Sequence, residues 1–170
     1  HRVRTWAPRG QTPVLQLAFN WKRLSVIAGV TVWTFYFRLY PGTIKSPQIV
    51  DFLRHLRRQL HRKLLIIWDG LKAHRSRLVQ QYVEACAGAI RLARLPAYAP
   101  ELNPAEYVWG YCKQHEMANF CPDDFAHLGR FARSRLRSGL LARGILAHAP
   151  EAFRADIAAV VHALETDFSD

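Results

Sequence analysis

Two carboxylates stand out because of the residues that surround them. Asp69 follows the continuous apolar run Leu64–Trp68, which predicts a central strand buried on both faces, with Asp69 at its carboxyl end. Glu106 follows a segment with prolines at positions 96, 100 and 104, which predicts a stiff loop and places Glu106 in the first turn of a helix. Either residue alone fits a simple turn or helix cap. Together they are hard oxygen donors that suit Mg²⁺.

The elements that would position these carboxylates alternate between strands and helices. β-Branched, aromatic and continuous apolar stretches predict strands at 26–32, 33–40, 64–68 and 90–95. Helical spacing and capping residues predict helices from Ser46 to about residue 60, at 76–87, from Ala105 through Lys113, at 123–141 and at about 151–165. This order predicts one α/β domain over 1–170, with a mixed sheet flanked by helices and a helical C-terminal part from about residue 120.

The charge is strongly basic and unevenly distributed. The net charge is +11, and residues 1–97 contain 17 Lys or Arg but only three acidic residues, namely Asp51, Asp69 and Glu84. Residues 98–170 contain seven basic and ten acidic residues. A basic face of this kind attracts polyanions such as nucleic acid, although a merely soluble basic surface is an equal alternative.

The cysteines argue against a secreted disulfide scaffold. There are three, an odd number without dense spacing: Cys86, Cys112 and Cys121. This indicates a reducing cytosol. Cys112, His115, Cys121 and His127 are an alternative zinc set, but their spacing is not that of a standard zinc finger. No apolar run reaches the roughly 18 residues of a membrane span.

Two segments carry a specific resemblance. The stretch 69–76, Asp-Gly-Leu-Lys-Ala-His-Arg-Ser, and the stretch from Leu95 through Trp109 to Lys113 resemble the DDE transposases of bacterial insertion sequences related to mariner elements. In that family the second catalytic Asp ends a strand and a His follows. The third carboxylate is the Glu of Asn-Pro-x-Glu-x-x-Trp, which is 103–109 in this chain. Asp69 and Glu106 are 37 positions apart, near the family separation.

The resemblance extends over at least residues 4–115, with small departures. The segment 5–13, Thr-Trp-Ala-Pro-Arg-Gly-Gln-Thr-Pro, is similar to the stretch after the family's first strand. Gly70 stands where the family commonly has Asn, and 99–101 reads Ala-Pro-Glu instead of Ser-Pro-Asp. These changes keep shape or charge.

One family feature is expected to be absent. The family's first Asp lies on a strand just upstream of the Trp-Ala-Pro stretch, and His1 is only five residues before Trp6. We therefore expect the first strand, its Asp and the N-terminal helix-turn-helix region to be missing from this chain. Asp51 lies in a predicted helix and cannot substitute for that Asp.

The resemblance implies a ribonuclease-H-like fold and an enzyme that cleaves DNA and transfers strands at transposon ends. Three carboxylates would hold two Mg²⁺ or Mn²⁺ ions; Asp69 and Glu106 are the two present here. In that family, water attacks first and the freed 3′-hydroxyl then attacks target DNA, and the resemblance implies the same order here. Lys72, Arg75 and Lys113 are candidate DNA contacts. His74 is expected either to orient a phosphate or metal-bound water, or to make a structural hydrogen bond.

The implied setting is a bacterial, cytoplasmic and nucleoid-associated protein, with transposon ends and target DNA as partners and a possible homo-oligomer in the full-length enzyme. With two of three carboxylates, we expect this chain to be nearly inactive. An alternative is a transposase remnant that acts only as a basic DNA-binding or interaction module. A structure-specific nuclease is a third hypothesis. An in-frame upstream strand carrying an Asp would favour the first hypothesis, and a stop codon or frameshift the second.

The charge distribution generates a first prediction. Binding to duplex DNA should not depend on sequence and should weaken at least about tenfold between about 50 and about 200 mM salt, because basic side chains release counterions from the phosphates. Fluorescence anisotropy titrations at the two salt concentrations measure this change. Affinity that does not respond to salt would contradict it.

Overall fold

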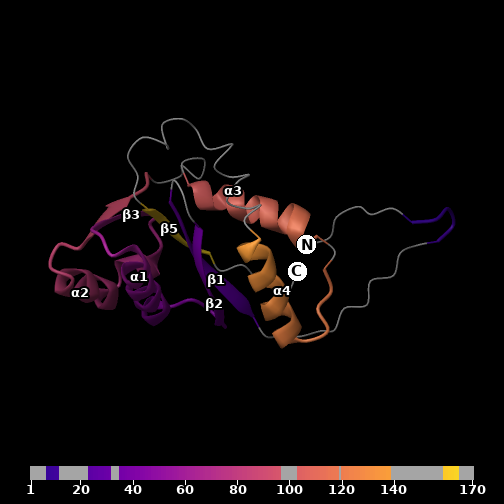
Figure 1. Ribbon diagram of the computed structural model, residues 1–170, viewed down its shortest axis with the longest axis horizontal. Helices are drawn as coiled ribbons and strands as arrows, with labels where there is room; N and C mark the ends of the chain where they lie inside the picture. Colours follow the sequence, from indigo (N-terminus) through magenta and orange to yellow (C-terminus); the bar gives the residue numbers. More distant parts are fainter. Residues whose placement is uncertain are drawn as a thin grey trace.

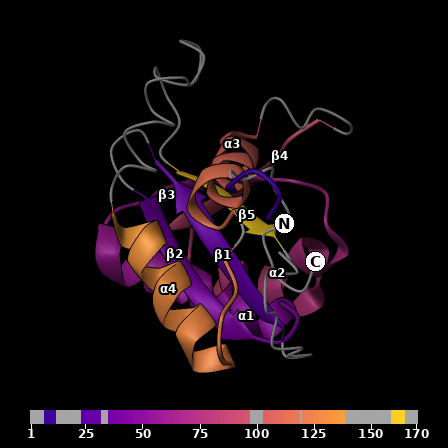
Figure 2. The ribbon, with the colours of Figure 1, turned by 90° about the vertical axis from the view of Figure 1, so that its right-hand side faces the viewer.

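The computed structural model describes residues 7–11, 23–31, 35–96, 103–118, 120–138 and 159–164. These residues form a mixed sheet with helices on both faces (Figures 1 and 2). In chain order the elements are β1 Leu24–Val30, β2 Phe35–Pro41, α1 Ser46–Leu60, β3 Leu64–Trp68, the 3-10 turn η1 Lys72–Arg75, α2 Arg77–Ala85, β4 Ile90–Arg94, α3 Pro104–Tyr111, the π turn η3 Cys112–Glu116, α4 Phe125–Arg137 and β5 Ala159–Leu164.

The sheet consists of two strand pairs joined by β5. Its order is β2-β1-β5-β3-β4. β1 and β2 pair antiparallel, from Leu24 opposite Pro41 to Val30 opposite Phe35. β3 and β4 pair parallel, with Ile66 opposite Leu92. β5 is antiparallel to β1 and parallel to β3. The predicted mixed sheet is therefore confirmed.

The predicted C-terminal helix is wrong over the part that the structure describes. We expected a helix at about 151–165, but Ala159–Leu164 is strand β5. This segment contains the β-branched pair Val160 and Val161, which favour a strand. A short apolar run fits the residue spacing of a helix and of a strand equally well. Its backbone pairs with the edges of both β1 and β3, which a helix would leave unpaired. The predicted helix at 123–141 agrees with α4 up to Arg137; residues 139–141 lie outside the described residues.

Two apolar cores lie on opposite faces of the sheet. Ile27 of β1, Leu53 of α1 and Ile66 of β3 belong to the core under α1 and α2. Val26 of β1, Val108 of α3 and Leu128 of α4 belong to the core on the other face. Figure 1 shows these helix pairs on either side of the sheet. Because alternate residues of β1 enter different cores, all seven of its residues are buried.

β3 is central, but only one of its faces is fully covered. Ile66 and Trp68 are buried in the core under α1, whereas Leu65 is 37% exposed. The prediction that Leu64–Trp68 is buried on both faces is therefore wrong for one face. α4 packs against β1 and β2, and α3 packs against β1 and β5; the core under these two helices contains no residue of β3. No helix among the described residues is long and apolar enough to cross a membrane.

The local sequence explains most helix boundaries. Ser76 caps α2 as predicted, with its Oγ accepting a hydrogen bond from Val79 N at 3.4 Å. The N-cap of α1 is Lys45 instead of the predicted Ser46, because the Gln48 side chain accepts a hydrogen bond from Lys45 N at 3.0 Å. Such capping gives hydrogen-bond partners to backbone N–H groups at the start of each helix that have none within the helix.

The two faces of β3 generate a second prediction. Ile66→Ala should lower the free energy of unfolding by about 2–5 kcal/mol, because it opens a cavity in the core under α1. Leu65→Ala should cost less than about 1.5 kcal/mol, because that side chain is partly solvated. Urea denaturation of both variants measures the difference. Equal losses would show that the Leu65 face is covered.

Candidate functional site

Asp69 directly follows β3, as predicted, and its carboxylate is held by its own loop. Leu71 N donates a hydrogen bond to Asp69 Oδ1 at 3.0 Å. His74 Nδ1 lies 2.9 Å from the same oxygen. The Asp69 side chain is 29% exposed. It is therefore oriented by the protein and still accessible from solvent.

His74 is buried behind this carboxylate. The residue is only 2% exposed. Its ring stacks on Trp68, with centroids 4.4 Å apart and planes 4° apart. Of the roles expected for His74, the hydrogen bond is the one that the structure contains. Sequence reasoning missed Trp68, although an aromatic residue directly before the Asp was visible as a signal.

Glu106 lies in the first turn of α3, as predicted. The helix begins at Pro104, one residue earlier than expected, and Asn103 is its N-cap. Asn103 Oδ1 accepts a hydrogen bond from Ala105 N at 3.1 Å, and Glu106 N donates to Asn103 O at 3.0 Å. The positive end of the helix dipole favours the partly buried Glu106 carboxylate at this position.

Apolar residues fix how α3 presents Glu106. Ala105, Val108 and Trp109 are buried against β1 in the second core. Residues four positions apart share a helix face, so Glu106 and Gly110 lie on another side of α3. Figure 1 shows α3 extending from one end of the sheet, above α4. Trp109 of the Asn-Pro-x-Glu-x-x-Trp segment is thus a packing residue.

Three of the predicted DNA contacts are exposed cations. Lys72 and Arg75 lie in the 3-10 turn that follows Asp69. Lys113 lies in the π turn that extends α3, where Met117 N donates to Cys112 O at 2.8 Å. In the chain, Lys72 and Arg75 therefore lie in the turn that follows Asp69, and Lys113 lies in the turn that follows the helix of Glu106.

The alternative zinc set is not assembled. No group of three or more His, Cys, Asp or Glu residues that could hold a metal exists within the part of the chain that the structure describes. Cys112 is buried in the second core, where burial, followed by the charge of Glu116, raises the pKa of its thiol to about 11. His115 packs against Tyr111 instead, with ring centroids 4.7 Å apart and planes tilted by 32°.

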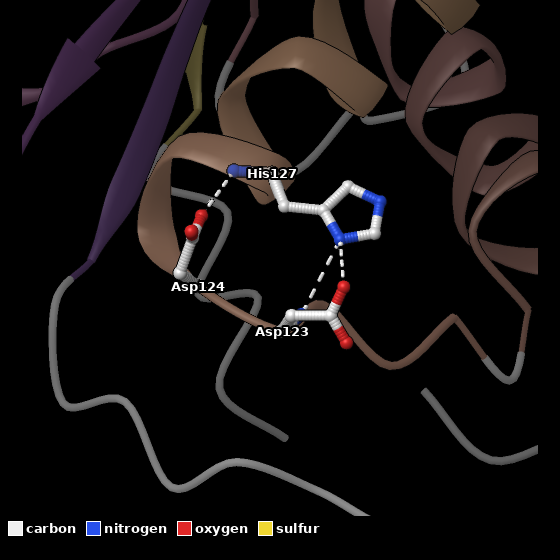
Figure 3. Close-up of polar contacts among 3 residues, drawn as sticks. All are labelled: Asp123, Asp124 and His127. Carbon is white, nitrogen blue, oxygen red and sulfur yellow. Dashed lines mark hydrogen bonds and ion pairs between the residues drawn. The ribbon is translucent and has the colours of Figure 1, made fainter.

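His127, the fourth member of that set, belongs to the cap of α4 (Figure 3). Its Nδ1 lies 2.9 Å from Asp123 Oδ2. Its backbone N donates to Oδ1 of Asp124, the N-cap residue. These contacts account for both acidic residues as helix-capping groups.

Asp51 lies in α1, as predicted, and its carboxylate contacts two side chains of β2. Tyr40 OH donates to Asp51 Oδ2 at 2.6 Å, and Arg38 lies 3.4 Å away. Burial and this hydrogen bond raise the pKa of Tyr40 well above its usual value. Asp51 therefore pairs with β2 on the α1 side of the sheet, whereas Glu106 is carried by α3 on the opposite side.

Comparisons with known proteins agree with this arrangement. The family model described as DDE superfamily endonuclease matches residues 1–125. The Mos1 mariner paired-end complex with Mn has a TM-score of 0.62 at 20% identity, covering 85% of this chain and 47% of that one. The Mos1 strand transfer complex has a TM-score of 0.58 at 20% identity, covering 85% and 46%.

A third structure, the Mos1 transposase catalytic domain with raltegravir and Mg, has a TM-score of 0.57 at 21% identity, covering 76% of this chain and 72% of that one. The fold is therefore the ribonuclease-H-like fold of that catalytic domain. The chain spans less than half the length of the Mos1 chains in the two DNA complexes. No curated protein sequence matches the chain significantly.

The buried thiol generates a third prediction. Cys112 should react with a thiol reagent much more slowly than the partly exposed Cys121, because the reagent needs an accessible thiolate. Since folding raises the Cys112 pKa from 9.0 to about 11, its contribution to stability should be complete below pH 9 and lost between about pH 9 and 11. Chemical unfolding of the wild type and Cys112→Ala across this range measures that contribution. Identical pH profiles would contradict it.

Proposed function

This chain belongs to the DDE superfamily of endonucleases, and on that basis we propose that it is the catalytic domain of a DNA transposase. It would cleave DNA at transposon ends and join the freed ends to target DNA. The observation that carries this proposal is the pair of carboxylates inside the family match: Asp69 after a central strand and Glu106 in the first turn of α3.

The donor chemistry of these two residues suits a divalent metal. Both are carboxylates, the oxygen ligands that Mg²⁺ and Mn²⁺ prefer. Asp69 is partly exposed and pre-oriented by Leu71 N, and Glu106 is partly buried at a helix start. We assign both as metal ligands. A pair of bound ions would supply activation of the attacking oxygen and stabilisation of the leaving one.

The remaining work of the chain is to bind and orient DNA. Lys72 and Arg75 are exposed in the turn after Asp69, and Lys113 is exposed in η3, which follows the helix that carries Glu106. We assign these three cations as phosphate contacts, which position DNA without reading its sequence. The similar Mos1 structures are a strand transfer complex and paired-end complexes, which supports transposon ends and target DNA as partners.

A homo-oligomer in the full-length enzyme and a nucleoid-associated location in a bacterial cytoplasm remain parts of this proposal. The second candidate function is a basic module that binds DNA without cutting it. It is favoured by the excess of basic over acidic side chains in residues 1–97. Metal binding by the two carboxylates distinguishes the candidates.

The fourth prediction tests this assignment. Asp69→Asn and Glu106→Gln should each weaken Mn²⁺ binding at least about tenfold, because each removes one anionic oxygen ligand. Isothermal titration calorimetry of the 170-residue chain measures the affinity. Glu84→Gln, an exposed carboxylate on α2, is the matched control and should leave the affinity unchanged.

A supercoiled-plasmid assay completes this test. The wild type is expected to nick weakly or not at all in Mn²⁺, and any nicking should disappear in both site variants. Robust nicking that survives Asp69→Asn would show that the active site lies elsewhere. Wild-type Mn²⁺ affinity in both variants would favour the non-cutting module.

A further inference from the structure

Asp69 has a close contact with His74, a residue that the proposed chemistry does not use. His74 Nδ1 lies 2.9 Å from Asp69 Oδ1 and 3.4 Å from the Asp69 backbone O. The imidazole is almost completely buried and lies parallel to the indole of Trp68. Trp68 is itself buried at the end of β3. The ring therefore has one fixed orientation, and that orientation directs Nδ1 at Asp69.

The surroundings of this ring assign its proton. Both atoms facing Nδ1 are oxygens, and a backbone carbonyl and an ionised carboxylate only accept hydrogen bonds. Nδ1 must therefore be the donor. Nε2 is buried without a hydrogen-bond partner among the described residues. With the donor proton on Nδ1, no N–H is needed at Nε2, where it would be a buried donor without a partner.

From this geometry we infer that His74 is a positioning residue for Asp69, a role that rests on the proposed function. Two donors, Leu71 N–H and His74 Nδ1–H, converge on Oδ1. Together they fix the plane of the carboxylate before any metal binds. The stack on Trp68 prevents the imidazole from turning away. A hydrogen bond that orients a metal ligand in this way raises metal affinity, because the ligand is already in place.

The turn between the two residues explains why His74 can reach back. η1, Lys72–Arg75, begins two residues after Gly70 and is closed by His74 N donating to Leu71 O at 3.1 Å. This single tight turn reverses the chain, so that Lys72 and Arg75 are exposed while His74 enters the protein. One turn thus supplies surface cations for DNA and a buried donor for Asp69.

Two substitutions separate the hydrogen bond from the packing. His74→Phe keeps a ring that can stack on Trp68 but removes the donor. His74→Asn removes the ring but keeps an amide N–H near the position of Nδ1. His127→Phe is the matched control, because His127 has the same 2.9 Å Nδ1–carboxylate distance in the cap of α4. Mn²⁺ affinity, measured by electron paramagnetic resonance of the free ion, and metal-free thermal unfolding are recorded for each variant.

A positioning role makes the two measurements diverge. His74→Phe should weaken Mn²⁺ binding by about 10–100-fold while retaining more thermal stability than His74→Asn. His74→Asn should recover most of the affinity, and His127→Phe should keep all of it. If His74 only packs in the core, Mn²⁺ affinity should follow thermal stability. His74→Phe would then bind Mn²⁺ more tightly than His74→Asn. Wild-type affinity in His74→Phe would overturn the inference.

A metal-independent spectrum separates this inference from the proposed function. A long-range ¹H–¹⁵N correlation spectrum of the histidines should show the Nδ1–H tautomer for His74, and its signals should shift in Asp69→Asn. A proton on Nε2 would overturn the inference even if the chain binds Mn²⁺. If the wild-type chain has the Nδ1–H tautomer but does not bind Mn²⁺, the proposed metal site is refuted. The positioning role is then refuted as well, but the hydrogen bond between His74 and Asp69 is still supported.

Discussion

The backbone hydrogen bonds of β5 connect the two halves of this domain. β1 and β2 form one pair, β3 and β4 form the other, and β5 lies between β1 and β3. This matters for the site because the two carboxylates belong to different halves. Asp69 follows β3, whereas Glu106 is carried by α3, which packs on β1. The relation between the carboxylates therefore depends on the pairing of β5 with both neighbours.

Within each half, short-range constraints then orient the carboxylate. On the β3 side, Trp68 holds the ring of His74, and His74 holds Asp69 Oδ1. On the α3 side, Asn103 closes the first turn and Ala105, Val108 and Trp109 bury the opposite face of the helix. Rigid elements with packed supporting residues keep functional groups within a narrow range of orientations. The orientation of each carboxylate thus depends on the residues that support it.

Basic and acidic side chains have different surroundings in this structure. The basic excess lies in residues 1–97, and Lys72 and Arg75 present part of it beside Asp69. The acidic residues outside the proposed site mostly have structural partners. Asp51 accepts a hydrogen bond from Tyr40, and Asp123 and Asp124 serve the start of α4. A polyanion would therefore meet cations near the proposed metal ligands, while Asp51, Asp123 and Asp124 are engaged elsewhere.

The sequence alone determined the strand before Asp69, the helix start at Glu106 and the exposed cations of the η1 turn, because apolar runs, prolines and capping residues act over a few positions. It did not determine that 159–164 is a strand, that Leu65 is partly exposed, or that His74 turns inward onto Trp68. Those outcomes depend on partners distant in sequence or on which face a neighbouring helix covers. A short apolar run fits either a helix or a strand until an unpaired sheet edge is available to it, and only the tertiary structure supplies that edge.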